Sequence, residues 1–194
     1  MIPVNGAHLP VDGNLSYGYR RSPTHVHNGI DLPAPVGTPI HAAAAGHVEH
    51  ANSVWVQGFT GYGRNVVLAH DDGARTLYGH MDTVAVVPGE FVAEGAPLGT
   101  VGRTEFGGPD HDTMLGPKGA HLHFEAALRS YPMPPTAERI DPVAWLLARG
   151  MSPEDLARAQ ARFDAARDIP EALIAGGLLL AALWYFRHKQ KGGA

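Results

Sequence analysis

Three short segments of the sequence place histidine beside residues that could bind a metal ion or move a proton. His27 and Asp31 lie four residues apart, His80 ends a second segment, and His121 and His123 lie two residues apart in a third. Histidine nitrogens and carboxylate oxygens bind zinc, and a catalytic zinc site has three protein ligands and one open position for water. A strand would project His121 and His123 to the same face. Each spacing alone is weak, because an isolated histidine more often has a structural or surface role.

The composition narrows the chemistry that is available. The 194 residues include 12 histidines and no cysteine, which excludes a disulfide scaffold, a cysteine-ligated zinc or iron–sulfur site and a thiol nucleophile. The formal net charge of −4 provides no overall basic field, so we expect no nucleic-acid partner. These counts favour metal chemistry carried by histidine and carboxylate.

The elements that position these residues are predicted to be short strands. The 24 glycines and 16 prolines make up about a fifth of the chain, against roughly 12% in average proteins, which favours turns and argues against a helical bundle. Short apolar runs end at turn signals, as residues 65–69 do before Asp71-Asp72-Gly73. We therefore predict a mostly antiparallel β domain over residues 1–150, with no useful helical period before Asp141.

The sequence after residue 150 has a different character. Ser152-Pro153-Glu154-Asp155 predicts a helix start, so residues 151–168 are expected to form a short amphipathic helix packed on the domain or on a lipid surface. Residues 172–186 carry no charge, and a helix over 169–186 would span roughly 27 Å, close to the ~30 Å hydrocarbon core of a membrane. We interpret 169–187 as a C-terminal transmembrane helix and 188–194 as a basic, glycine-containing tail. A buried C-terminal helix is the alternative.

Together, the histidine segments resemble the lysostaphin-like (LytM-type) zinc endopeptidases, which cut the peptide part of peptidoglycan. The resemblance runs in order from about Tyr17 to Leu147 and is specific in combination. It rests on the stretches GYRRSP (18–23), HNGIDL with PAPVGTPI (27–40), GYGRNVV (61–67), LYGHM (77–81), HLHFE (121–125) and IDPVAWL (140–146).

The resemblance implies zinc bound by His27, Asp31 and His123, with His80 and His121 acting on the water and on the scissile carbonyl. It also implies a β-sheet core with a sandwich-like hairpin extension and a cleft that runs along the metal. The expected function is hydrolysis of cross-links or stem peptides in bacterial peptidoglycan. The stretch 102–120 is longer than usual in the family, which leaves the substrate preference open.

Other histidines have weaker claims to the site. His25 lies two residues before His27 and could share its face, and His70 follows an apolar run where family members often carry histidine; both are candidates to support the metal ligands. The remaining six are expected to face solvent or pack locally: His8, His41, His47, His50, His111 and His188.

Two non-enzymatic functions compete with hydrolysis. A non-catalytic LytM-like module, which binds the wall or activates another hydrolase, would lack one or more of the five site residues, whereas this chain has all of them. A lipoyl or biotinyl carrier would need a modifiable lysine in the hairpin-like stretch 86–101. The lysines of this chain lie elsewhere, at Lys118, Lys189 and Lys191.

The two ends of the chain predict conflicting locations. Residues 1–14 have neither a basic start nor a continuous apolar stretch, so we expect no N-terminal signal peptide. A tail anchor without a leader would leave the domain in the cytoplasm, and three basic residues on each side of the apolar run leave its orientation open. The explanations are a misassigned start, access to the wall after membrane damage, or carriage in a virus particle. We favour a membrane-anchored, phage-associated wall hydrolase used in entry or lysis, whose partners include the lipid membrane and other virion or envelope membrane proteins.

Overall fold

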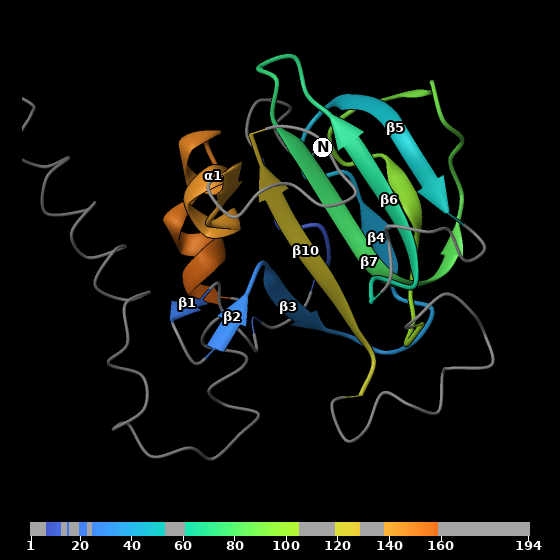
Figure 1. Ribbon diagram of the computed structural model, residues 1–194, viewed down its shortest axis with the longest axis horizontal. Helices are drawn as coiled ribbons and strands as arrows, with labels where there is room; N and C mark the ends of the chain where they lie inside the picture. Colours follow the sequence, from blue (N-terminus) through green and yellow to red (C-terminus); the bar gives the residue numbers. More distant parts are fainter. Residues whose placement is uncertain are drawn as a thin grey trace, which may run out of the picture.

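An antiparallel β-sheet organises the part of the chain that the computed structural model describes, namely residues 7–12, 15, 20–22, 25–52, 61–104, 119–128 and 138–158. Within these residues, nine strands belong to one connected sheet, and β1 (Arg20–Ser22) and β2 (His25–His27) form a separate pair (Figure 1). Every strand pair among them is antiparallel. The predicted mainly β, antiparallel class is confirmed.

The strands of this sheet do not follow the order of the chain. The main path consists of β11 (Arg139–Ile140), β10 (His121–Ala127), β7 (Arg75–Val84), β6 (Arg64–Ala69), β5 (Gly46–Asn52) and β8 (Phe91–Val92). The other strands are β3 (Ile30–Pro33), which pairs with β10, β9 (Pro97–Val101), which pairs with β7, and β4 (Pro39–His41), which pairs with β9. The long strand β7 thus joins β10 and β6 to the β4–β9 pair.

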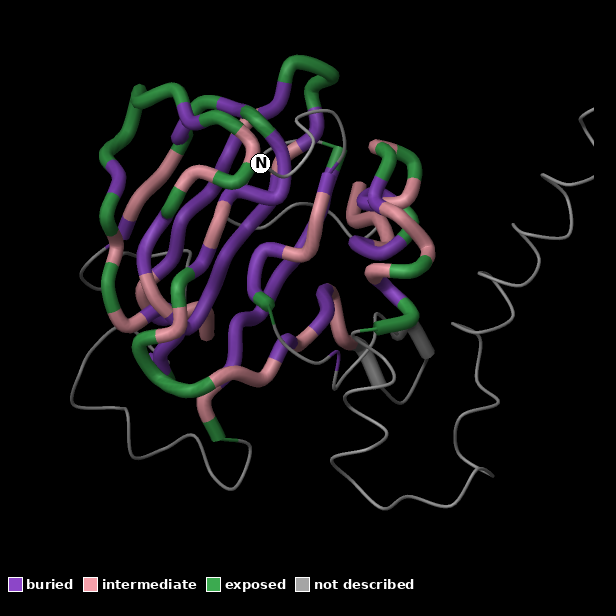
Figure 2. The backbone as a smooth tube through the Cα atoms, turned by 180° about the vertical axis from the view of Figure 1, so that it is seen from behind, coloured by how far each residue is buried: buried purple, intermediate pink, exposed green. Residues whose placement is uncertain are grey.

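The two faces of β10 divide between core and site. Leu122 and Phe124 point into the main hydrophobic core, whereas His121, His123 and Glu125 alternate with them and point to the other face. All seven residues of the strand are nevertheless buried. Figure 2 shows that the central strands of the sheet are buried, whereas the turns at its ends are exposed.

The turn between β6 and β7 matches its sequence signal. Gly73 has a φ of +84°, in the left-handed region that glycine adopts without a steric cost. The backbone N–H of His70 donates to the carbonyl of Ala74 at 2.9 Å, and the N–H of Ala74 donates to the Asp72 carboxylate at 3.0 Å. The turn predicted at Asp71-Asp72-Gly73 is therefore confirmed.

Two helical segments follow the sheet. In α1 (Pro142–Ala148), the Asp141 carboxylate caps the N-terminus by accepting from Val143 N at 2.9 Å. Residues 153–158 are also helical, and the hydroxyl oxygen of Ser152 accepts from Asp155 N at 3.1 Å, so the predicted helix start is confirmed. Met151 and Leu156 are buried in the main core, which shows that the beginning of the 151–168 segment packs on the domain.

Several predicted elements lie outside the described residues. These are most of the 151–168 segment, the transmembrane helix at 169–187, the tail at 188–194, and residues 105–118 of the long stretch before β10. Within the described part of the chain, no helix combines the length and apolar character needed to cross a membrane.

Candidate metal centre

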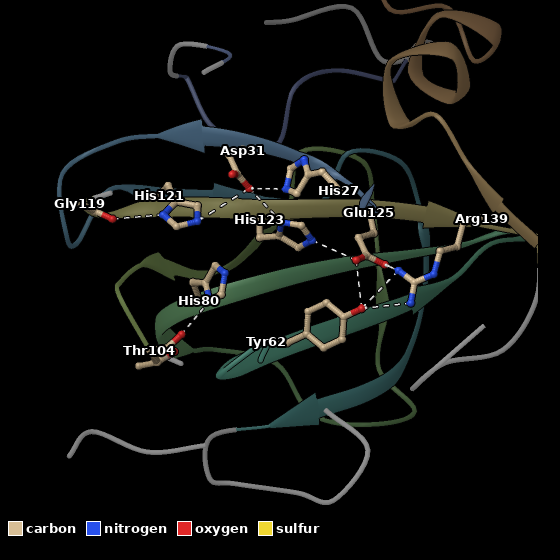
Figure 3. Close-up of polar contacts among 10 residues, drawn as sticks. All are labelled: His27, Asp31, Tyr62, His80, Thr104, Gly119, His121, His123, Glu125 and Arg139. Carbon is tan, nitrogen blue, oxygen red and sulfur yellow. Dashed lines mark hydrogen bonds and ion pairs between the residues drawn. The ribbon is translucent and has the colours of Figure 1, made fainter. Parts of the chain in front are cut away.

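The structure brings together the three residues predicted to bind zinc. His27 lies at the end of β2, Asp31 lies in β3 and His123 lies in β10 (Figure 3). Asp31 Oδ1 is 3.3 Å from His27 Nε2 and 2.9 Å from His123 Nδ1. One ligand atom of each residue lies within 4.8 Å of the others. A set of two ring nitrogens and one carboxylate oxygen is typical of catalytic zinc sites.

Strand pairing creates this cluster from distant parts of the chain. Asp31 and His123 are 92 residues apart, and the β3–β10 register places them directly opposite each other. Gly29 lies between the two predicted ligands of the first segment, and the space around it excludes a side chain. A Cβ there would overlap the carbonyl oxygen of Phe124 and come within 3.0 Å of His123 Cε1. The glycine lets the first segment lie close enough to β10 for His27 to reach His123.

The two predicted catalytic histidines lie beside the ligands. The ring centroids of His80 and His121 are 4.7 Å apart, and the ring of His80 is 5.7 Å from that of His123. His80 Nδ1 donates to the carbonyl of Thr104 at 2.8 Å, and His121 Nδ1 donates to the carbonyl of Gly119 at 3.1 Å. A carbonyl oxygen only accepts, so each ring carries a hydrogen on Nδ1 and keeps Nε2 for other chemistry.

His80 owes its position to a bulge in β7. The β6–β7 register shifts between Arg64 and Val66, and His80 has a φ of +61°, unlike the other described non-glycine residues. Such a conformation costs about 1–3 kcal/mol and persists only where neighbours hold it. Here, His80 N donates to the carbonyl of Tyr62 at 2.7 Å, and the His80 carbonyl accepts from Gly102 N at 3.0 Å.

Thr104 holds the carbonyl that orients the His80 ring. Its buried hydroxyl accepts from Arg64 N at 2.9 Å and donates to the carbonyl of Met81 at 2.8 Å. Gly63 has a φ of +60°, and a Cβ there would overlap the Thr104 carbonyl. Contacts with Arg64 of β6 and Met81 of β7 therefore hold Thr104 in place, and with it the carbonyl that accepts from His80.

The comparisons with known proteins agree with this geometry. Residues 25–135 match the sequence profile of peptidase family M23. The chain belongs to peptidase family M23. This match includes all five predicted site residues, from His27 to His123.

The M23 domain is similar to both curated and solved proteins. It is 34% identical over 125 residues to the DD-carboxypeptidase/endopeptidase Mpg of Neisseria meningitidis, covering 62% of this chain and 25% of that one. It is similar to lysostaphin, an antimicrobial peptidase from Staphylococcus simulans, with a TM-score of 0.59, 26% identity, and coverage of 76% of this chain and 54% of the other. For a zinc-containing peptidase from Vibrio cholerae, the TM-score is 0.51 and the identity 26%, with coverage of 71% and 39%. The chain thus spans about a quarter of the length of its curated relative Mpg.

Electrostatics hold the ligand side chains of the M23 domain together. Burial alone would raise the pKa of Asp31, but hydrogen bonds from His123 and His27 outweigh burial and hold this pKa well below its usual range. Burial lowers the pKa of His123, and the carboxylates of Asp31 and Glu125 outweigh it and raise the pKa to about 9. In this structure, a proton on His123 supplies the positive charge beside the Asp31 carboxylate. A metal ion bound between the two side chains would supply that charge in its place.

His80 has the opposite electrostatic character. Burial, together with the neighbouring rings of His123 and His121, lowers the pKa of His80 to about 3. The ring is therefore neutral at neutral pH, with the lone pair of Nε2 free of a proton. The lone pair of Nε2 is therefore available to a hydrogen-bond donor that enters the site.

Glu125, a residue with no predicted role, lies against the predicted metal ligand His123. Its carboxylate is 1% exposed and accepts from His123 Nε2 at 3.0 Å, from the Tyr62 hydroxyl at 3.0 Å and from Arg139 at 2.6 Å. The period-2 alternation of His121, His123 and Glu125 along β10 is the sequence pattern that predicts Glu125 on the same face as His123.

The histidines outside the predicted metal and catalytic residues lie in different environments. His70, considered as support for the ligands, instead has its ring nitrogens at 2.8 Å from the Ala45 carbonyl oxygen and 2.9 Å from Thr76 Oγ1. That expectation was wrong, because the odd–even alternation of β6 sends His70 to the core side. The side chain of His25 lies outside the described residues. His8 pairs with Glu94 at 3.2 Å and His47 packs against Phe91, as expected of histidines with local contacts.

Proposed function

We propose that this M23 domain is a zinc-dependent endopeptidase that hydrolyses cross-links or stem peptides of bacterial peptidoglycan. The observation that carries the proposal is the convergence of His27, Asp31 and His123 with the His80 and His121 rings beside them. The names of the similar proteins support it, since Mpg is a DD-carboxypeptidase/endopeptidase and lysostaphin is an antimicrobial peptidase.

The residues fit a zinc ion. His27, Asp31 and His123 supply three donors of suitable type within 4.8 Å of one another. When bound, zinc lowers the pKa of its water and polarises a carbonyl group.

The two neighbouring histidines have separate roles in the proposed hydrolysis, one in proton transfer and one at the scissile carbonyl. His80 Nε2 is left to accept the proton of the attacking water, because the Nδ1 hydrogen is already donated to Thr104. His121 lies on the same side of the ligands, with Nε2 3.8 Å from Asp31 Oδ1, where it can contact the scissile carbonyl. The proton taken by His80 leaves with the amine product, so each peptide bond consumes one water.

Mass spectrometry of fragments from defined peptidoglycans tests this function directly. The full chain should release peptide fragments whose new amine and carboxyl ends identify the bond, and a chelator should stop their release. Restoration by added zinc provides the control. A protein that binds zinc and peptidoglycan but releases no fragment would instead be a wall-binding module.

We also infer that residues 169–187 attach the domain to a lipid membrane. The support is the uncharged run at 172–186, followed by the basic residues Arg187, Lys189 and Lys191. In vesicle flotation, the full chain should rise with lipid, whereas a chain ending at residue 168 should stay soluble and keep its hydrolase activity. Loss of folding on truncation would favour the buried-helix alternative.

Carriage in a phage particle is the location that we propose for the anchored protein. It would bring the hydrolase to the wall during entry, with virion or envelope membrane proteins as neighbours. Co-purification with phage particles and release by detergent would support this location. Protein found solely in membranes of uninfected cells would contradict it.

A further inference from the structure

Behind His123 lies a buried ion pair that the proposed hydrolysis does not use. Glu125 and Arg139 contact each other at 2.6 Å, and both side chains are buried. Tyr62 completes the group, with its hydroxyl 3.4 Å from both terminal nitrogens of Arg139 (Figure 3). A buried ion pair is weak evidence of a contribution to stability, because desolvation offsets the attraction of the charges. Its position next to a metal ligand points to a different role.

The ring of His123 lies between two carboxylates. Nδ1 faces Asp31 Oδ1 at 2.9 Å, and Nε2 faces Glu125 Oε1 at 3.0 Å. An imidazole has two nitrogens, and the partner of one determines which nitrogen is left for a metal. Glu125 accepts the Nε2 hydrogen and thereby directs Nδ1 towards Asp31 and His27.

Glu125 can do this only if its own carboxylate is held. Arg139 contacts Oε2, and Tyr62 donates to Oε1, the same oxygen that accepts from His123. Tyr62 also packs with Val67 and Leu77 in a small apolar cluster, and Leu77 lies directly opposite Glu125 in the β7–β10 register. These contacts leave the carboxylate little freedom to turn.

We propose that Glu125 and Arg139 are positioning residues for the metal ligand His123, and that Arg139 sets zinc affinity from a strand that supplies no ligand. The proposal rests on the proposed function, since it takes His27, Asp31 and His123 as the zinc ligands. Arg139 belongs to β11, which leads directly into α1. The segment that closes the domain is therefore also part of what orders the metal site.

A purely structural role for the ion pair makes a different prediction. If Glu125 and Arg139 only joined β10 to β11, their replacement would lower the melting temperature of the metal-free protein and leave zinc affinity unchanged. A positioning role requires that zinc affinity falls as well. Zinc affinity is therefore the measurement that separates the two.

The test compares zinc dissociation constants of the full chain by competition with a chromophoric chelator. Glu125→Gln should weaken zinc binding by about 10- to 100-fold, the range found when the carboxylate partner of a metal-binding histidine is lost. Arg139→Met should weaken it by a smaller factor. Arg139→Lys should weaken it less than Arg139→Met does, because lysine keeps the positive charge but lacks the guanidinium that reaches both Glu125 and Tyr62. In the double variant Glu125→Gln/Arg139→Met, the two losses should be less than additive, since both act on one carboxylate.

Val48→Ala is the matched control. Val48 is buried in β5, which β6 and β7 separate from β10, so its replacement should lower the melting temperature without changing zinc affinity. Zinc constants of Glu125→Gln and Arg139→Met both within about twofold of the unmodified chain would overturn the proposal. If Glu125→Gln fails to fold, the Arg139→Met and Arg139→Lys pair decides the question. A chain that binds no zinc, or an Asp31→Asn variant that binds it normally, would instead refute the proposed function.

Discussion

Two buried histidines, His123 and His70, lie on opposite sides of one sheet and have different hydrogen-bond partners. On one side, His123 lies between the carboxylates of Asp31 and Glu125, at 2.9 and 3.0 Å. On the other, His70 lies between the Ala45 carbonyl and Thr76 Oγ1, at 2.8 and 2.9 Å, with the Trp145 ring 5.1 Å away. Both rings are buried and both use their two nitrogens.

The difference shows that burial alone does not distinguish a metal site from a structural histidine. Burial lowers the pKa of His70, and the bond to Ala45 opposes this only in part. At His123, the two carboxylates outweigh burial and raise the pKa. The negative charge of the partners therefore marks the side of the sheet that favours a cation. His70 instead links Ala45 to Thr76 of β7 and packs against Trp145 of α1.

Replacement of His123 should produce the largest effect. His123→Ala removes one of three ligands, so the protein should lose stoichiometric zinc and with it the digestion of peptidoglycan. Metal analysis after gel filtration and release of labelled wall fragments measure the two properties. A variant that keeps one zinc per chain would show that the metal lies elsewhere.

Replacement of His80 should separate metal binding from chemistry. His80→Ala removes the proton acceptor but no ligand, so zinc content should stay the same while the hydrolysis rate falls by about 10²- to 10⁴-fold. Single-substrate kinetics on a defined peptide measures the rate. Equal activity in His80→Ala and the unmodified chain would exclude His80 from the reaction.

Replacement of Thr104 should have an intermediate effect. Thr104→Val keeps the shape but loses the hydrogen bonds to Arg64 N and Met81 O, which frees the carbonyl that orients His80. We expect kcat to fall on the order of tenfold, with KM and zinc content nearly unchanged, because a small misplacement of a reacting group is costly. Thr104→Ser keeps the hydroxyl and should restore the rate. A rise in KM with kcat unchanged would instead point to a loss of substrate binding rather than to a misplaced His80 ring.

The His70 side of the sheet should respond to pH rather than to metal. The pKa of His70 is lowered on folding from 6.5, so the unfolded chain binds more protons just below that pH and stability falls as the solution is acidified. The stabilising contribution of neutral His70 is fully present above pH 6.5. Chemical denaturation of the metal-free protein should therefore show a smaller acid-induced loss in His70→Gln. Identical pH profiles in the two proteins would mean that His70 does not titrate on unfolding.

Much of the site could be predicted from the sequence. The two-residue spacing of His121 and His123 requires a common face in any strand. The four-residue spacing of His27 and Asp31 permits both donors to reach one ion if a turn lies between them. Together with the family resemblance, these local patterns identified the residues that the structure brings together. The antiparallel class was also predictable, because turn signals such as that at Gly73 act over a few residues.

What the sequence determined by itself was the set of donors and the local geometry of each short segment, since strand alternation and turn chemistry depend on near neighbours. Only the tertiary structure decided which segments meet. The β3–β10 register joins Asp31 to His123, the bulge in β7 turns His80 into the site, and Arg139 reaches Glu125 from the strand before α1. The first contact depends on the pairing of two strands whose residues are 92 positions apart, and the other two depend on a bulge and on a strand pairing that the alternation along a single strand does not specify.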